Sequence, residues 1–262
     1  VLIVCLASLV VLDTVHRTHA QTPIKIVTST TILLDIAKNI AADKADLAAM
    51  VPTDGDPHEF EPTPETIRLV ADANVIFVNG AGLEIFLEKL ITDSGTKAAV
   101  VTVSQGVAIR QFVEPGAAVA TGEAMPEGVI GFSGTVDCSI HGEGEGNCDP
   151  HMWQDPINVI QYVTNIRDAL IMADPANADT YKINAAKYMY ALQSLDAETW
   201  HKIETIPADK RILITNHDAL GYFVARYGFK LAGTVLPGVS TDAEPTPQEV
   251  ALLIERLKQS GV

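Results

Sequence analysis

Short apolar segments that are rich in β-branched residues alternate with amphipathic segments along this chain. Runs such as IKIVT, NVIFV and AAVVTV are typical of buried strands, whereas apolar residues at every third or fourth position are typical of helices. The pattern predicts strands at 24–28, 47–51, 74–78, 98–103, 211–215 and 229–236. It predicts helices that begin near 30, 64, 82, 155, 177, 218 and 246. Because parallel strands need a crossover between them, usually a helix, this alternation indicates an α/β fold with mostly parallel sheets.

Several predicted helices begin at residues that favour helix N-termini. Thr63 and Asp155 are each followed by proline, so we expect both side chains to cap their helices. Asp218 is expected to cap the helix that follows the strand at 211–215. These caps define where the expected crossovers start.

One long helical segment divides the α/β pattern into two parts. Residues 177–205 carry a single apolar stripe, formed by Tyr181, Ala185, Tyr188, Leu192 and Leu195. We therefore expect an N-terminal lobe over 21–175, a linking helix over 176–206 and a second lobe over 207–262. Because only two strands are predicted in the second lobe, we expect that lobe to be incomplete here.

The first twenty residues differ from the rest of the chain. Residues 1–12 (VLIVCLASLVVL) are apolar but fall short of the roughly 20 residues that a membrane span needs. Polar residues follow, and then Ala20, a small residue suited to a cleavage site. The sequence therefore predicts a signal peptide over 1–20, with Cys5 inside it, and a periplasmic protein.

Charge and cysteine content narrow the function classes. The net charge of −15 argues against nucleic acid as a partner, since binding phosphates needs clustered Lys and Arg. Cys138 and Cys148 are the cysteines that remain after the signal peptide, and export favours a disulfide between them. Both lie in a long acidic, glycine-rich loop over 104–150.

Three histidines stand in settings that suit a shared metal site. His58 lies in GDPHEFEPTP, a proline-pinned loop after a predicted strand, and His151 lies in the similar DPHMWQDP. His217 follows the strand at 211–215. Ligands of parallel sheets bind outside the carboxyl ends of the strands, where His58 and His217 are expected. We therefore expect the three imidazoles to share one divalent metal, with zinc favoured by its preference for imidazole and a carboxylate or water as a fourth ligand.

Four motifs, in this order, resemble those of one known family: DPHEFEPTPE, DPHMWQDP, TNHDALGYFVARYG and STDAEPTP. The long helix lies between the second and the third motif. They are similar to the metal-binding proteins of zinc and manganese ABC importers, the cluster A-I, zinc-uptake and TroA-like group. The resemblance covers nearly all of residues 23–262. It implies two Rossmann-like α/β lobes joined by one rigid helix, with the metal held between them.

The same resemblance implies a function and ligand roles. It places the ligand roles on His58, His151 and His217, and a His as the third ligand favours Zn²⁺ over Mn²⁺. Glu59, beside the first histidine, is the candidate fourth ligand within this chain, because the family's usual carboxylate lies beyond residue 262. The implied activity is capture of metal by a monomer and delivery to an ABC transporter permease in the inner membrane, without catalysis.

Three other interpretations stay open at this point. A zinc hydrolase could use three His and a water, although residue 62 is Pro where an H-E-x-x-H motif needs His, and G-x-S-x-G is absent. The spacing of Cys138-x2-His141 and Cys148-x2-His151 also fits a Cys2His2 zinc site. Members of the resembled family can also be adhesin-like surface proteins.

Overall fold

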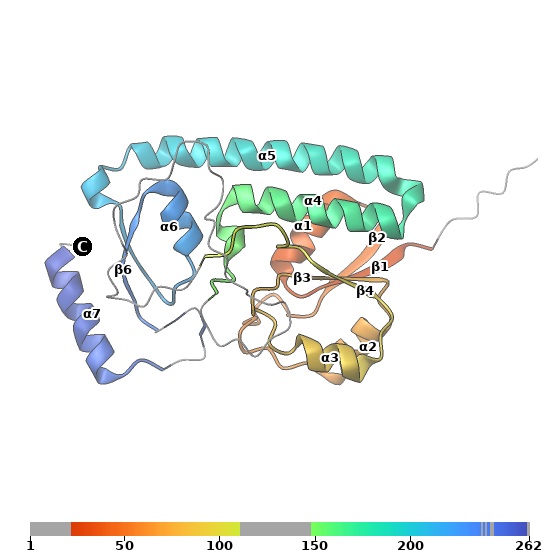
Figure 1. The fold of residues 1–262 in the computed structure, drawn as a ribbon, viewed down its shortest axis with the longest axis horizontal. Helices are drawn as coiled ribbons and strands as arrows, with labels where there is room; N and C mark the ends of the chain where they lie inside the picture. Colours follow the sequence, from red (N-terminus) through yellow and green to blue (C-terminus); the bar gives the residue numbers. More distant parts are fainter. Residues whose placement is uncertain (1–21, 111–147, 237, 239, 242–243, 261–262) are drawn as a thin grey trace, which may run out of the picture.

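The computed structural model describes residues 22–110, 148–236, 238, 240–241 and 244–260. Two α/β units lie next to each other, and the long helix α5 (Ala178–Glu204) runs along both of them (Figure 1). The expected signal peptide over 1–20, most of the loop over 104–150 and the residues Cys138 and His141 lie outside the described residues.

A four-stranded sheet forms the centre of the first unit. Its strands are β1 (Ile24–Thr28), β2 (Ala45–Ala49), β3 (Val75–Val78) and β4 (Ala99–Thr102). They pair in the order β2-β1-β3-β4 and all pairs are parallel, which confirms the prediction from the alternating pattern. Along β3, Val75 and Phe77 pack into one apolar cluster, and Ile76 and Val78 into the other. The sheet is therefore buried on both faces, as parallel sheets usually are.

Helices cover both faces of this sheet. They are α1 (Thr31–Ala41), α2 (Pro64–Ala71), α3 (Leu87–Ser94) and α4 (Pro156–Ala173). Thr63 accepts a hydrogen bond from the backbone N–H of Thr66 at 3.2 Å, and Asp155 accepts one from Ile157 at 2.8 Å. Both expected N-caps are thus confirmed. α4 follows the second D-P-H motif in the chain and packs against the sheet.

The second unit contains a smaller sheet. Its elements are β5 (Ile212–Thr215), α6 (Gly221–Tyr227), β6 (Lys230–Thr234) and α7 (Pro247–Ser260). β5 and β6 pair in parallel, again as predicted. The loop between β5 and α6 carries His217, so this histidine lies at the carboxyl end of a strand.

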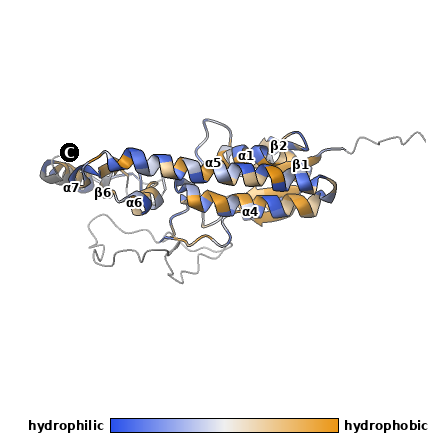
Figure 2. Cartoon of the chain, turned by 90° about the horizontal axis from the view of Figure 1, so that it is seen from above, coloured by the Kyte–Doolittle hydropathy of each residue, from blue (hydrophilic) through white to orange (hydrophobic). Residues whose placement is uncertain are grey.

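The linking helix lies against the first unit along much of its length. Tyr181, Ala185 and Leu192 are buried in the cluster that also contains residues of α1 and α4. α4 and α5 run alongside each other when seen from above (Figure 2). Leu195, expected in the same apolar stripe, is half exposed instead. The stripe ends there because the helix continues past the first unit toward α6.

Three further predictions need correction. β2 ends at Ala49 rather than residue 51. α3 begins at Leu87 rather than residue 82, because Gly80, Ala81 and Gly82 all have positive φ angles, which are incompatible with a right-handed helix. Asp218 does not cap α6: the helix starts at Gly221 without a side-chain cap. The backbone N–H of Asp218 instead donates to Gly238 O at 3.0 Å, which extends the loop.

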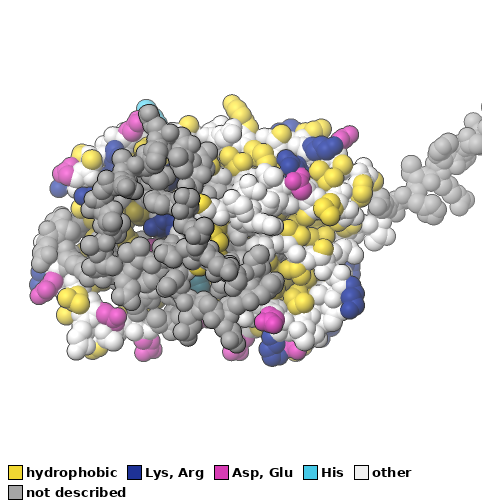
Figure 3. All heavy atoms as spheres, viewed as in Figure 1, with side chains coloured by type: hydrophobic (Ala, Val, Ile, Leu, Met, Phe, Trp, Pro, Cys, Tyr) yellow, Lys and Arg dark blue, Asp and Glu magenta, His cyan; other side chains and the backbone are white. Residues whose placement is uncertain are grey.

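Two surface properties bear on the partners of this protein. Within the described part of the chain, no helix combines the length and hydrophobicity needed to cross a membrane. On the face shown in Figure 3, the described Lys and Arg side chains lie scattered among Asp and Glu instead of forming one patch. The described residues on this face therefore do not form a basic patch of the kind that binds nucleic acid.

Candidate metal centre

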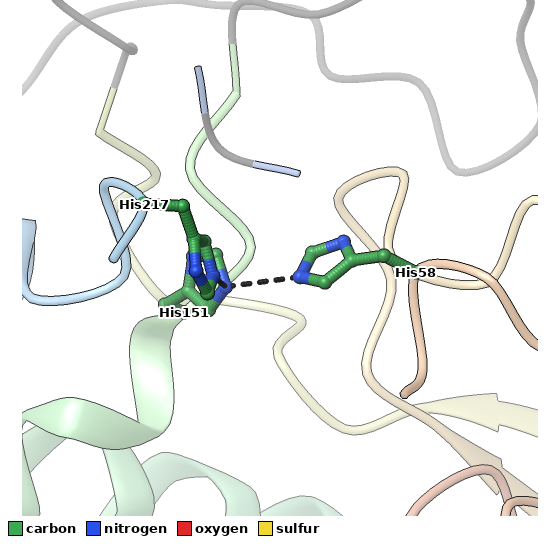
Figure 4. A group of neighbouring side chains, drawn as sticks. All are labelled: His58, His151 and His217. Atoms are coloured by element: carbon green, nitrogen blue, oxygen red, sulfur yellow. Dashed lines mark hydrogen bonds between the residues drawn. The ribbon is translucent and has the colours of Figure 1, made fainter. Parts of the chain in front are cut away.

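Three loops from both units bring His58, His151 and His217 together (Figure 4). His58 lies between β2 and α2, His151 directly precedes a short 3-10 helix (Met152–Gln154) that leads into α4, and His217 follows β5. One ligand atom from each residue lies within 4.8 Å of the others. Among the described residues this is the one such group of His, Cys, Asp and Glu.

The spacing of the ring nitrogens suits a bound ion. The Nε2 atom of His151 lies 3.2 Å from Nε2 of His58 and 3.2 Å from Nε2 of His217. Two nitrogens that each lie about 2.05 Å from a tetrahedral zinc ion are about 3.3 Å apart. The three imidazoles can therefore coordinate one ion with little movement, and a fourth position would be left for water or a further ligand.

Each D-P-H motif forms the same local turn. Asp56 Oδ1 accepts a hydrogen bond from the backbone N–H of His58 at 2.9 Å, and Asp149 Oδ1 accepts one from that of His151 at 3.0 Å. The aspartate thus fixes the backbone of the histidine two residues later, as an Asx turn does. The repeated tripeptide was visible in the sequence, but these two aspartates were not among the predicted site residues.

The aspartates differ in their second contacts. Asp149 Oδ1 also lies 2.9 Å from Nδ1 of His151, and both side chains are buried. Asp56 Oδ2 accepts a hydrogen bond from Thr241 Oγ1 of the second unit at 2.6 Å. Burial by itself would raise the pKa of Asp56, but the hydrogen bonds from Thr241 and from the His58 backbone outweigh it and hold the pKa below its usual value. Asp56 therefore stays ionised beside the histidines.

Burial also affects the charge of the third histidine. The partial burial of His217 lowers its pKa below the usual value, and the neighbouring His151 lowers it further, while Asp56 and Asp149 act in the opposite direction. A lower pKa favours the neutral imidazole at neutral pH. This is the form that binds metal ions.

The remaining sequence candidates lie apart from this group. Glu59 is exposed and does not belong to the cluster of ligand atoms, because its neighbour His58 is the residue that turns inward. Cys148 is disulfide-bonded, so it lacks the thiolate that a Cys2His2 zinc site needs. Cys138 lies outside the described residues, and its pairing with Cys148 stays a prediction. His201, the described histidine outside this group, was not a candidate and is exposed on α5.

Comparison with known proteins gives the family. The family model described as "ZnuA: Zinc-uptake complex component A periplasmic" matches residues 26–262. The chain belongs to this family. It is 34% identical to the metal ABC transporter substrate-binding lipoprotein FimA of Streptococcus parasanguinis over 243 residues, which cover 93% of this chain and 71% of FimA. It is 35% identical to the manganese ABC transporter substrate-binding lipoprotein PsaA of Streptococcus pneumoniae, covering 91% and 70% of the two chains.

Solved structures agree with the ZnuA-family fold. The periplasmic zinc-binding protein TroA of Treponema pallidum superposes with a TM-score of 0.73 at 25% identity, covering 92% of this chain and 76% of TroA. A crystal structure of ZnuA has the same TM-score at 23% identity, with coverage of 92% and 81%. The two-lobed α/β fold with parallel sheets is thereby confirmed.

Proposed function

We propose that this protein captures Zn²⁺ between its two α/β lobes and delivers it to the permease of an ABC importer. The observation that carries this proposal is the group of three imidazoles: His58 and His151 come from the first unit, and His217 comes from the second. Membership of the ZnuA family supports transport, and relatives such as FimA and PsaA are named as substrate-binding lipoproteins of metal ABC transporters.

Zinc is the metal that the donor set favours. Among the described residues, the group consists of three imidazole nitrogens without a carboxylate, which suits Zn²⁺, whereas Mn²⁺ prefers carboxylate and water oxygens. The relatives do not agree on one metal: PsaA is named for manganese, and MtsA of Streptococcus pyogenes, 32% identical, is named for iron. Mn²⁺ is therefore the competing cargo in the tests below.

The mechanism follows from how the ligands are divided between the lobes. We assign the lobes to 21–175 and 207–262, joined by a linking helix over 176–206. Closing the lobes brings His217 to the other two histidines, and separating them removes one of three ligands. Docking on an inner-membrane permease would release the ion in this way. The protein acts as a monomer outside the cytoplasm, after export, and performs no catalysis.

A thermal melt of the metal-free protein with added Zn²⁺ or Mn²⁺ tests the proposal. A ligand that binds only the folded state stabilises it by about 2.7 kcal/mol at a hundredfold excess over Kd. We expect a large rise in Tm with Zn²⁺, a smaller one with Mn²⁺, and loss of most of the rise in His217→Ala. The matched control is His201→Ala, which removes an exposed histidine from α5. Absence of a shift with either metal would contradict the proposed function.

Two other functions are separated by related variants. If Cys138→Ser abolished zinc binding as completely as His217→Ala, a Cys2His2 site in the loop would replace the three-histidine centre. A three-histidine zinc hydrolase would turn over ester or peptide substrates when loaded with zinc, and family membership argues against it. An adhesin-like role would appear as binding to host surfaces that persists in His217→Ala.

A further inference from the structure

A buried aspartate connects His151 to the second unit. Each polar atom of Asp149 has a partner: its N–H donates to Arg110 O at 2.9 Å, and its carbonyl oxygen accepts from Tyr222 Oη at 2.9 Å. Its Oδ2 accepts from Arg110 Nη1 at 3.2 Å, and its Oδ1 contacts His151. With 1% of its side chain exposed, Asp149 is held in one position.

We propose that Asp149 is a positioning residue for His151, and that the second unit holds Asp149 in place through Tyr222 and Arg110. A carboxylate 2.9 Å from Nδ1 requires the imidazole proton on that nitrogen. The lone pair of Nε2 then faces His58 and His217, which is the form that a metal needs. The importance for metal binding rests on the proposed function, whereas the position of the proton does not.

Tyr222 and Arg110 join the two units at this point. The backbone N–H of Arg110 donates to Tyr222 Oη at 2.9 Å, so this hydroxyl bonds to Arg110 and Asp149 at once. The guanidinium carbon of Arg110 lies 5.5 Å from the centre of the Tyr222 ring. Arg110 and Asp149 belong to the first unit, and Tyr222 belongs to α6 of the second.

At the start of α6, Gly221 lies against Arg110 and Asp149, with no room for a Cβ unless these side chains move. A Cβ at Gly221 would lie 1.6 Å from Arg110 Nη1 and 2.6 Å from Asp149 Oδ2. Because the arginine end is flexible, Gly221→Ala would displace the guanidinium from Asp149, and the carboxylate of Asp149 would have to shift as well. A single methyl group on the second unit would thus disturb the support of His151 in the first.

Asp149→Asn tests the role of the carboxylate. The asparagine oxygen can keep the hydrogen bond from the backbone N–H of His151, but the negative charge that favours a proton on Nδ1 of His151 is lost. Long-range ¹⁵N–¹H NMR spectra of the metal-free protein distinguish the two tautomers. We expect the Nδ1–H form in the wild type and a gain of the Nε2–H form in Asp149→Asn. The control is Asp174→Asn, since Asp174 is a buried aspartate that accepts from Tyr181 Oη away from the centre.

Zinc affinity, measured by competition with a chromophoric chelator, tests the link to the second unit. We expect Asp149→Asn to weaken zinc binding about 10- to 100-fold. Gly221→Ala and Tyr222→Phe should each weaken it about 2- to 10-fold, as loss of a supporting hydrogen bond does. Gly233→Ala is the control for Gly221→Ala, since among the described residues its Cβ would meet only the movable side chain of Leu253.

The results separate this inference from the proposed function. The inference is overturned if metal-free wild type carries the proton on Nε2, or if the three variants bind zinc as tightly as their controls. If the wild type binds no zinc, the proposed function fails, and the tautomers of wild type and Asp149→Asn still decide whether Asp149 positions His151.

Discussion

The two D-P-H tripeptides hold their histidines in the same turn but in different surroundings. Asp149 is buried and contacts the His151 ring, so this ligand is fixed within the first unit. Asp56 is half-buried, and its second carboxylate oxygen accepts a hydrogen bond from Thr241 of the second unit. His58 is therefore held in part by a contact that exists only while the two units lie together.

Removal of the Thr241 hydroxyl should weaken metal binding. Thr241→Val keeps the shape of the side chain but eliminates the 2.6 Å hydrogen bond to Asp56. We expect a loss of about 2- to 10-fold in zinc affinity, the usual value of one hydrogen bond. Isothermal titration measures it. Thr92→Val, at an exposed threonine on α3, is the control, and an equal effect in both variants would contradict a specific role for Thr241.

Helix α5 contacts the second unit through Arg226 and Tyr227 of α6. Arg226 of α6 binds both oxygens of Asp196 on α5, at 2.5 and 2.6 Å, and its Nε lies 3.3 Å from Oδ1 of Asp155, the N-cap of α4. Tyr227 Oη adds a hydrogen bond to Asp196 at 2.9 Å. One guanidinium thus connects three helices, and it couples the N-terminus of α4, next to His151, to the second unit.

The pH dependence of stability should reveal this ion pair. Burial by itself would raise the pKa of Asp196, but hydrogen bonds from Arg226 and Tyr227 outweigh it and lower the pKa. A lowered folded-state pKa stabilises the protein above the unfolded pKa of about 3.9, and this contribution is lost as the pH falls through the folded value. Asp196→Asn should therefore cost about 2 kcal/mol at pH 7 and progressively less below pH of about 4.

Urea unfolding of wild type and Asp196→Asn at several pH values measures this difference. Asp179→Asn is the control on the same helix, because Asp179 is 92% exposed and its pair with Lys182 should contribute little. A gap between wild type and Asp196→Asn that is the same at pH 3 and pH 7 would show that the carboxylate charge is not its source.

At the scale of the whole molecule, the candidate centre lies where the two units meet. The first unit supplies two imidazoles and the second supplies one. Beside them, the hydrogen bonds of Thr241 to Asp56 and of Tyr222 to Asp149 also connect the two units. A bound ion would add a further connection between the units. The relative position of the units and the occupancy of the centre should therefore depend on each other.

Hydrogen exchange should show this coupling. With saturating zinc, we expect slower amide exchange in the His58 loop over 50–63 and in the loop over 216–220. In His217→Ala, zinc at the same concentration should leave the second of these loops unprotected, because only the ligands of the first unit remain. Mass spectrometry of exchanged peptides measures both loops. Protection over 216–220 that survives in His217→Ala would contradict a centre shared by the two units.

The sequence by itself determined the local elements and the residues that were predicted for the candidate centre. The strand β1, the helix α4 and the caps at Thr63 and Asp155 could be predicted, because periodicity and capping depend on residues close in the chain. Parallel pairing followed from the alternation of strands and helices. The three histidines could be named from their repeated or strand-end settings, although the sequence could not show how they meet.

Tertiary structure alone decided the features that depend on distant residues. Leu195 is half exposed because α5 extends beyond the first unit. The backbone N–H of Asp218 donates a hydrogen bond to Gly238, and Asp218 does not cap α6. Glu59 lies outside the candidate centre. Asp149, which was not among the predicted site residues, is held by Arg110 and Tyr222 from positions 39 and 73 residues away. Such contacts depend on how segments that are distant in the sequence pack together, and no local pattern of residues encodes them.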